Sequence, residues 1–116
     1  MPPPETTLVA CLCAAWCRTC DDYNTVFAAL EQHNPGCRFV WIDIEDEAEL
    51  VGDLDVETFP TLLIGVGPEL RFIGPVTPQL GTAQRVLDSA LQAPMAAPEP
   101  TALALLARLQ STNLTP

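Results

Sequence analysis

The sequence predicts an α/β fold in which helices flank a mixed four-stranded sheet, with the element order β-α-β-α-β-β-α. Three observations support this prediction. Apolar runs of strand length alternate with segments whose apolar residues recur at helical spacing. A strand, a helix and a second strand in succession favour a parallel pair with a right-handed crossover. Two later apolar runs, separated by a Gly-Pro-Glu turn, favour an antiparallel hairpin, which makes the sheet mixed.

The first half of the chain supplies the predicted β-α-β unit. The apolar run Thr6 to Ala14 has the length of a buried strand. From Cys17 to about His33, apolar residues recur every three or four positions, as in an amphipathic helix. Asn34-Pro35-Gly36 ends this helix. The run Cys37 to Ile44 is rich in β-branched and aromatic residues and therefore predicts the second strand.

The second half supplies a short helix, the hairpin and a closing helix. The acidic segment Glu45 to Leu54 predicts the short helix, which Gly52 weakens. Phe59 to Val66 and Leu70 to Gly74 predict the two strands of the hairpin. Pro78 to Leu91 predicts the closing helix, with its proline in the first turn, where a proline is tolerated.

The composition changes after Gln92, so we divide the chain into a domain, 1–92, and a tail, 93–116. The tail begins as a Pro- and Ala-rich linker and then predicts a short amphipathic helix from Thr101 to Gln110. The apolar residues of this helix share one face: Ala102, Leu105, Leu106 and Leu109. Such a face either docks on the domain, frays with the tail, or binds a partner or a second copy.

Charge and hydropathy exclude two classes of partner. The net charge of −10 opposes binding to DNA or RNA phosphates. No apolar run is long enough to cross a membrane. The run Leu8 to Cys17 is short enough for a signal-peptide core, but no Lys or Arg precedes it, so we interpret it as a strand. We therefore expect a reducing cytoplasmic location, where a close pair among five cysteines is catalytic or metal-binding.

The segment Trp16-Cys17-Arg18-Thr19-Cys20 has the residues that thiol–disulfide exchange needs. We expect Cys17 at the start of the first helix, where the helix dipole and the Arg18 cation stabilise a thiolate. Cys20 falls one turn later on the same face, within reach of a disulfide to Cys17. Trp16 can shield the pair and offer an apolar surface to an incoming chain.

These residues carry a family resemblance. AAWCRTC after a strand, followed by DVETFPTLLIG, resembles the thioredoxin family over about Leu8 to Leu91. The resemblance implies a thioredoxin-like fold and a protein disulfide oxidoreductase without a cofactor, with Cys17 and Cys20 as the catalytic pair. It also implies that Pro60 follows a cis peptide bond. A tight corner there frees backbone groups for pairing with an extended ligand, so Phe59, Pro60 and Thr61 join Trp16 as substrate-binding residues.

The sequence departs from the family at several positions that would modulate the chemistry. Arg18-Thr19 stands where most thioredoxins have Gly-Pro, and a cation there favours the thiolate and hence a more oxidising protein. Cys11 occupies the position of the family's buried Asp, and Trp41 that of the accompanying Lys. The leading strand and helix of larger thioredoxins do not precede the first strand.

Three interpretations of Cys11 and Cys13 remain open on the sequence. Two residues apart on a strand, they point to the same face. They are either small core residues, or ligands of a metal or iron–sulfur site with Cys17 and Cys20. Alternatively, Cys11 lies beneath Cys20 as a third exchanging thiol.

The sequence thus predicts an oxidoreductase that exchanges protein disulfides or dithiols through Cys17 and Cys20. Its reductant would be of the thioredoxin-reductase or glutathione type, with no bound metal, nucleic acid or membrane. The alternative is a binding module or a Cys-ligated metal carrier on the same scaffold, since a fold does not by itself define a function.

Overall fold

A computed structural model describes residues 7–14, 17–52, 59–67, 69–76, 79–92 and 100–111. The predicted order β-α-β-α-β-β-α is confirmed, and the predicted last helix follows it. The elements are β1 (Thr7–Cys13), α1 (Arg18–His33), β2 (Arg38–Asp43), α2 (Ala48–Val51), β3 (Thr61–Val66), β4 (Glu69–Pro75), α3 (Leu80–Gln92) and α4 (Pro100–Ser111). No helix in the described ranges is long and apolar enough to cross a membrane.

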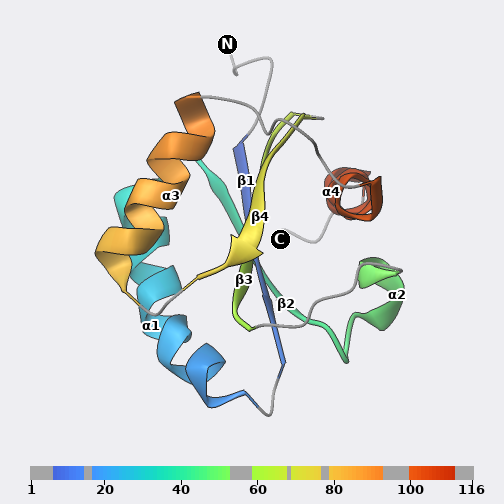
Figure 1. The fold of residues 1–116 in the computed structure, drawn as a ribbon, viewed down its shortest axis with the longest axis horizontal. Coiled ribbons are helices and arrows are strands. Elements are labelled where there is room, and N and C mark those ends of the chain that lie inside the picture. Colours follow the sequence, from blue (N-terminus) through green and yellow to red (C-terminus); the bar gives the residue numbers. More distant parts are fainter. Residues whose placement is uncertain are drawn as a thin grey trace.

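The four strands form one mixed sheet in the order β2-β1-β3-β4. The predicted parallel pair is β1 with β2, in the register Leu8↔Arg38. The predicted hairpin is β3 with β4. Strand β1 also pairs antiparallel with β3, in the register Leu12↔Thr61, and this pairing places β1 inside the sheet. Figure 1 shows the sheet edge-on, with β1 running through the middle of the molecule.

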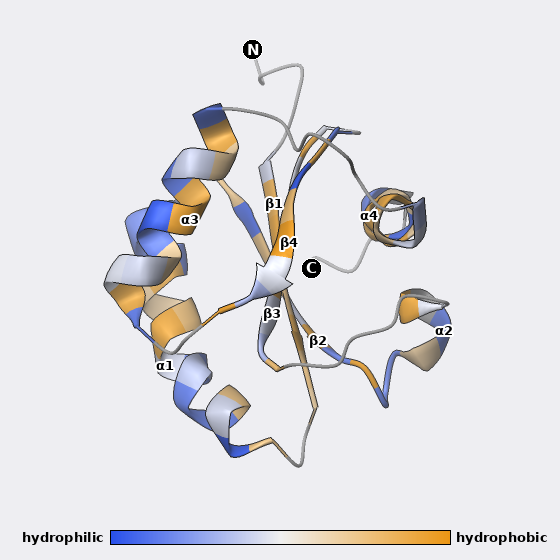
Figure 2. Ribbon diagram, in the orientation of Figure 1, coloured by the Kyte–Doolittle hydropathy of each residue, from blue (hydrophilic) through white to orange (hydrophobic). Residues whose placement is uncertain are grey.

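Helices cover both faces of the sheet, with α1 and α3 on one side and α2 and α4 on the other (Figure 1). Side chains alternate along β1, so one strand contributes to two hydrophobic clusters. The cluster on the α4 side includes Leu8, Ala10 and Leu12. The cluster on the α1 side includes Val9, Cys11 and Cys13. Figure 2 shows strands coloured mainly as hydrophobic, whereas α1 and α3 carry residues of both kinds.

Helix α4 belongs to the core. Arg108 Nη2 donates to the Val51 carbonyl at 3.1 Å, which fixes the helix beside α2. Arg38 Nη1 donates to the Leu109 carbonyl at 3.4 Å, which fixes it to the edge strand β2. The residues expected to share an apolar face are all buried in the cluster on this side: Ala102, Leu105, Leu106 and Leu109. Of the options left open by the sequence, the structure shows this face docked on the sheet.

Some predicted boundaries shift in the structure for local reasons. Helix α2 begins later than its acidic segment, at Ala48, and Gly52 ends it at φ 64°, a left-handed conformation that glycine adopts without steric cost. Cys17 caps helix α1 instead of lying within it. The predicted positions of Pro78 and of the linker, 93–99, lie outside the described residues.

Helix α4 packs so closely on the sheet at Gly65 that a larger residue there should disturb it. A Cβ atom on Gly65 would lie 2.5 Å from Leu106 Cδ1 and 2.7 Å from its Cδ2. Leu106 is itself fully buried, so it cannot swing away. We expect Gly65→Ala to lower the free energy of unfolding by about 1–3 kcal/mol in urea titrations. Gly36→Ala, whose Cβ meets nothing within 4 Å, is the control and should cause no loss. Equal stability of the two variants would contradict this close packing.

Candidate functional site

The junction between β1 and α1 positions Cys17. Its φ of −88° and ψ of 116° are extended, so Cys17 is the N-cap and the helix begins at Arg18. The Cys17 N–H donates to the Ala14 carbonyl at 3.0 Å, which closes a turn between strand and helix. Cys17 is a free, partly exposed thiol, and its side chain makes no capping hydrogen bond in the described structure. Arg18 and Thr19 are exposed in the first turn. The thiol therefore stands at the positive end of the helix dipole.

Cys20 lies one turn further into α1, but its disulfide partner differs from the predicted one. The Cys20 sulfur is bonded to Cys13, not to Cys17. The Cα atoms of Cys13 and Cys20 are 5.9 Å apart, within the ordinary range for a disulfide. Cys13 is the last residue of β1 and packs in the same cluster as Cys20, beneath the first turn of α1. Both residues are buried, with exposed fractions of 1% and 2%.

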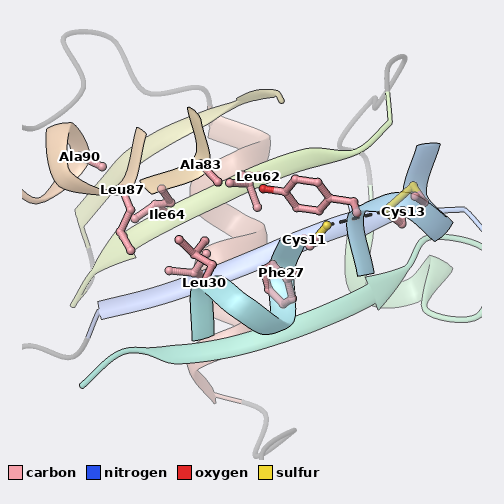
Figure 3. Close-up of a cluster of buried hydrophobic side chains, with 12 residues drawn as sticks. Cys11, Cys13, Phe27, Leu30, Leu62, Ile64, Ala83, Leu87 and Ala90 are labelled. Carbon is pink, nitrogen blue, oxygen red and sulfur yellow. Dashed lines mark hydrogen bonds between the residues drawn. A yellow bond between two sulfur atoms is a disulfide. The ribbon is translucent and has the colours of Figure 1, made fainter. Parts of the chain in front are cut away.

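Cys11 lies deeper on the same face. Its sulfur is 3.6 Å from that of Cys13, which confirms that the two residues share a face of β1 (Figure 3). Cys11 is a free, fully buried thiol, and burial raises its pKa. It thus fits the interpretation as a core residue, whereas Cys13, which is buried in the same cluster, is bonded to Cys20. The hypothesis that Cys11 lies beneath Cys20 as a third thiol stays a prediction; in the structure the Cys20 sulfur is bonded to Cys13, and Cys11 is a free thiol.

The structure does not favour the four-cysteine metal site. The sulfurs of Cys13 and Cys20 are bonded to each other, so neither is a thiolate ligand here. Within the described ranges, no three His, Cys, Asp or Glu residues are grouped so that they could hold a metal ion.

Pro60 lies across the sheet from the disulfide. The Phe59–Pro60 bond is cis, as the family resemblance implies. Thr61 pairs with Leu12, so continuing the register by one residue places Pro60 opposite Cys13. The Pro60 carbonyl accepts a hydrogen bond from the Val76 N–H at 3.1 Å. Phe59 packs against the same cluster as Cys17, whereas Thr61 is buried in the sheet. The predicted role of Trp16 concerns a residue outside the described ranges.

Two residues at this site have roles that were not predicted from the sequence. Cys13 could have been inferred from its same-face spacing with Cys11, had the position of α1 above the strand end been known. Tyr23 lies in the segment predicted as an amphipathic helix, and no role at the site was predicted for it. Its hydroxyl is fully buried and has no hydrogen-bond partner among the described residues. Burial raises the pKa of Tyr23, and the charge of a neighbouring Cys11 thiolate raises it further.

The different surroundings of Cys17 and Cys11 predict different reactivity. Cys11 is fully buried and its pKa is raised, so almost no thiolate is present or reachable at pH 8. We expect iodoacetamide to alkylate Cys17 at least about a hundredfold faster than Cys11 in the native protein. Peptide mapping after timed quenching measures both rates, and full labelling in urea serves as the control. Similar native rates would show that Cys11 is accessible, contrary to the structure.

A four-stranded mixed sheet with a cysteine at the N-cap of its first helix and a cis-proline across the sheet defines a thioredoxin-like protein with a redox-type cysteine pair. The comparisons agree with this class. The family model described as Thioredoxin matches residues 3–75, and the chain therefore belongs to the thioredoxin family.

Solved structures of thioredoxins share the fold. The oxidised mitochondrial thioredoxin 3 of Saccharomyces cerevisiae is 22% identical, with a TM-score of 0.63 over 73% of this chain and 80% of that one. Thioredoxin from Trypanosoma brucei brucei is 19% identical, with a TM-score of 0.65 over 76% and 77%. A chloroplastic thioredoxin z is 17% identical, with a TM-score of 0.65 over 78% and 82%. No curated protein matches the sequence.

Proposed function

We propose that this protein is a thiol–disulfide oxidoreductase that exchanges disulfides of protein substrates, with Cys17 as the attacking thiol and Cys20 as the resolving thiol. The observation that carries the proposal is the contrast between the two residues. Cys17 is partly exposed at the N-cap of α1, and Cys20 is buried one turn later with its sulfur already engaged in a disulfide. One thiol can meet a substrate, and the other is protected from it.

The reaction starts from the reduced protein, in which the Cys13–Cys20 bond of the structure is open, and proceeds by two exchanges. The Cys17 thiolate attacks one sulfur of a substrate disulfide, forms a mixed disulfide and releases the other substrate sulfur as a thiolate. The Cys20 thiolate then attacks the Cys17 sulfur, forms the Cys17–Cys20 bond and releases the second substrate thiolate. The substrate gains two electrons and two protons, and the cysteine pair loses them. The reverse sequence oxidises a substrate dithiol.

Surrounding residues would serve the same exchange. Cys17 lies at the N-cap of α1, at the positive end of the helix dipole, and exposed Arg18 follows it directly in the sequence. Phe59 and Pro60 would form the surface that receives the substrate chain, together with Trp16 and Thr61 by family resemblance. We propose a cytoplasmic protein that is reduced by a partner of the thioredoxin-reductase or glutathione type. Membership of the thioredoxin family supports the choice of reductant.

Trapping of the mixed disulfide tests the proposal. Without the resolving thiol, Cys20→Ser should accumulate a covalent adduct between Cys17 and a chain of insulin, used as a probe disulfide. Cys17→Ser should give no adduct. Cys37→Ser is the matched control, because Cys37 precedes the residue that pairs with Leu8 and so lies at the other end of β1. It should react as the wild type does. An adduct that maps to Cys37, or none at Cys17, would refute the assignment.

A further inference from the structure

The bond between Cys13 and Cys20 gives the resolving cysteine a second partner. We propose that Cys13 is a third exchanging thiol, which displaces Cys17 from Cys20 and moves the disulfide from the accessible end of α1 into the core. This inference rests on the proposed roles of Cys17 and Cys20, and it adds a step after the second exchange.

The fold holds Cys13 where this step needs it. Cys13 ends β1, and its carbonyl accepts a hydrogen bond from the Ile44 N–H at 2.9 Å, so the strand is anchored up to that residue. Its Cα lies 5.9 Å from that of Cys20, close enough for a bond without movement of the backbone. Cys17 packs against the same cluster from the N-cap. The Cys20 sulfur is thus bonded to a residue of the sheet, and Cys17 precedes Cys20 by one turn at the start of the same helix.

The exchange balances within the protein. Starting from the Cys17–Cys20 disulfide, the Cys13 thiolate attacks the Cys20 sulfur. The Cys13–Cys20 bond forms, the Cys17–Cys20 bond breaks, and Cys17 leaves as a thiolate. One disulfide is present before and after, so no external oxidant or reductant takes part. The proton that Cys13 gives up is balanced by the proton that Cys17 takes up from water.

The surroundings of the two thiols favour this direction. Before the step, the negative charge must lie on Cys13, which is 1% exposed in an apolar cluster. After the step it lies on Cys17, which is partly exposed at the positive end of a helix. A thiolate in apolar surroundings is costly, and one at a helix N-terminus is stabilised. The step therefore moves charge outward while the disulfide moves inward.

The product is an oxidised protein that still presents a free thiol. In the state with Cys13 bonded to Cys20, the disulfide is buried and Cys17 remains a nucleophile at the surface. A reductant cannot reach the buried bond directly, so reduction first requires Cys17 to attack Cys20 again. Oxidation by this route leaves the disulfide in the core and Cys17 as a free thiol.

Cys11 supplies a matched control for Cys13. It lies on the same strand and face, is equally buried, and its sulfur is 3.6 Å from that of Cys13. It remains a free thiol. Replacement of Cys11 thus perturbs the same cluster without removing a bonded sulfur.

Disulfide mapping of the full chain tests the proposal. The protein is oxidised in a glutathione buffer, quenched in acid, alkylated and cleaved after Trp16 and Arg18. A Cys13–Cys20 bond joins the peptide ending at Trp16 to the peptide starting at Thr19, whereas a Cys17–Cys20 bond joins the latter to the Cys17-Arg18 fragment. We expect the wild type and Cys11→Ala to give the first product with Cys17 alkylated. Cys13→Ala should give the second.

Two variants make the outcome decisive. Cys17→Ser should still lose two thiols on oxidation, because Cys13 and Cys20 remain; this test leaves the Cys13 side chain in place and does not depend on the folding of Cys13→Ala. In oxidised wild type, Cys17 should be alkylated at least tenfold faster than in oxidised Cys13→Ala. Oxidised wild type containing only the Cys17–Cys20 bond, with no two-thiol loss in Cys17→Ser, would overturn the inference while the proposed function stood.

Failure of the proposed function has a different signature. In that case Cys17 forms no insulin adduct, and oxidised Cys13→Ala shows no Cys17–Cys20 bond. A Cys13–Cys20 bond that persists under those conditions would be purely structural, which overturns both the function and the exchange step.

Discussion

Serine in place of Cys17 should lower the rate at which the protein reduces insulin disulfides, with dithiothreitol as electron donor, by about a thousandfold or more. A hydroxyl does not attack a disulfide at neutral pH, and the other cysteines near the site cannot substitute for Cys17. Cys13, Cys20 and Cys11 are each no more than 2% exposed, so a protein substrate cannot approach their sulfurs. The measurement is the rate of insulin precipitation after subtraction of the rate with dithiothreitol alone.

Two other variants serve as controls for this prediction. Cys37→Ser should keep the wild-type rate, because Cys37 lies at the far end of β1. Cys20→Ser should lose turnover but keep a single covalent capture of substrate at Cys17, since only resolution fails. If Cys17→Ser retained its rate, the chain would reduce disulfides through another thiol. If the wild type had no rate but still bound partners, the binding-module interpretation would replace the oxidoreductase.

Removal of the tail, 93–116, should abolish cooperative unfolding of the remaining chain. Helix α4 buries Leu105, Leu106 and Leu109 against the sheet. Each buried leucine contributes about 1.5–3 kcal/mol, so the three together contribute about 5–9 kcal/mol. That sum is comparable to the whole stability of an ordinary domain, about 5–15 kcal/mol. We expect a chain ending at Gln92 to show no sharp transition in urea, followed by circular dichroism.

Point variants in α4 distinguish the effect of lost packing on stability from the effect of shortening the chain. Leu106→Ala should lower the free energy of unfolding by about 2–5 kcal/mol, because it leaves a cavity between α4 and β3. Ala107→Ser, on the exposed side of the same helix, should change it by less than about 0.5 kcal/mol. A truncated chain that unfolds at the wild-type urea concentration would show instead that 1–92 is a complete domain.

The sequence predicted the elements well because their signals are local. Apolar runs, helical periodicity and one acidic segment identified every helix and strand that the structure describes, and most boundaries agree within two residues. The antiparallel pairing of β1 with β3 was not predicted, since it depends on how segments far apart in the chain meet. The docking of α4 is also a long-range feature, because the helix packs on a sheet face formed by strands far away in the sequence. An amphipathic helix shows which of its faces is apolar, but not what covers that face.

The candidate site was predicted in its residues but not in its bonding. The spacing of Cys17 and Cys20 predicts that the two can meet, and it contains no information about a strand beneath the helix. Cys13 reaches Cys20 only because β1 ends directly below the first turn of α1. The distance between a strand end and a helix face is set by the tertiary structure, so the spacing of residues in the sequence does not predict it. The cis bond before Pro60 was predicted correctly because a short motif carries it.

Helix α4 also makes the order of synthesis matter. A chain leaves the ribosome from its N-terminus, so all four strands emerge before the helix that covers one of their two faces. Synthesis from Pro75 to Ser111 takes about 2 to 7 s at the usual rates of translation. During that interval Leu8, Ala10 and Leu12 have no α4 to cover them, so one face of the sheet exposes apolar side chains to solvent until the tail is made.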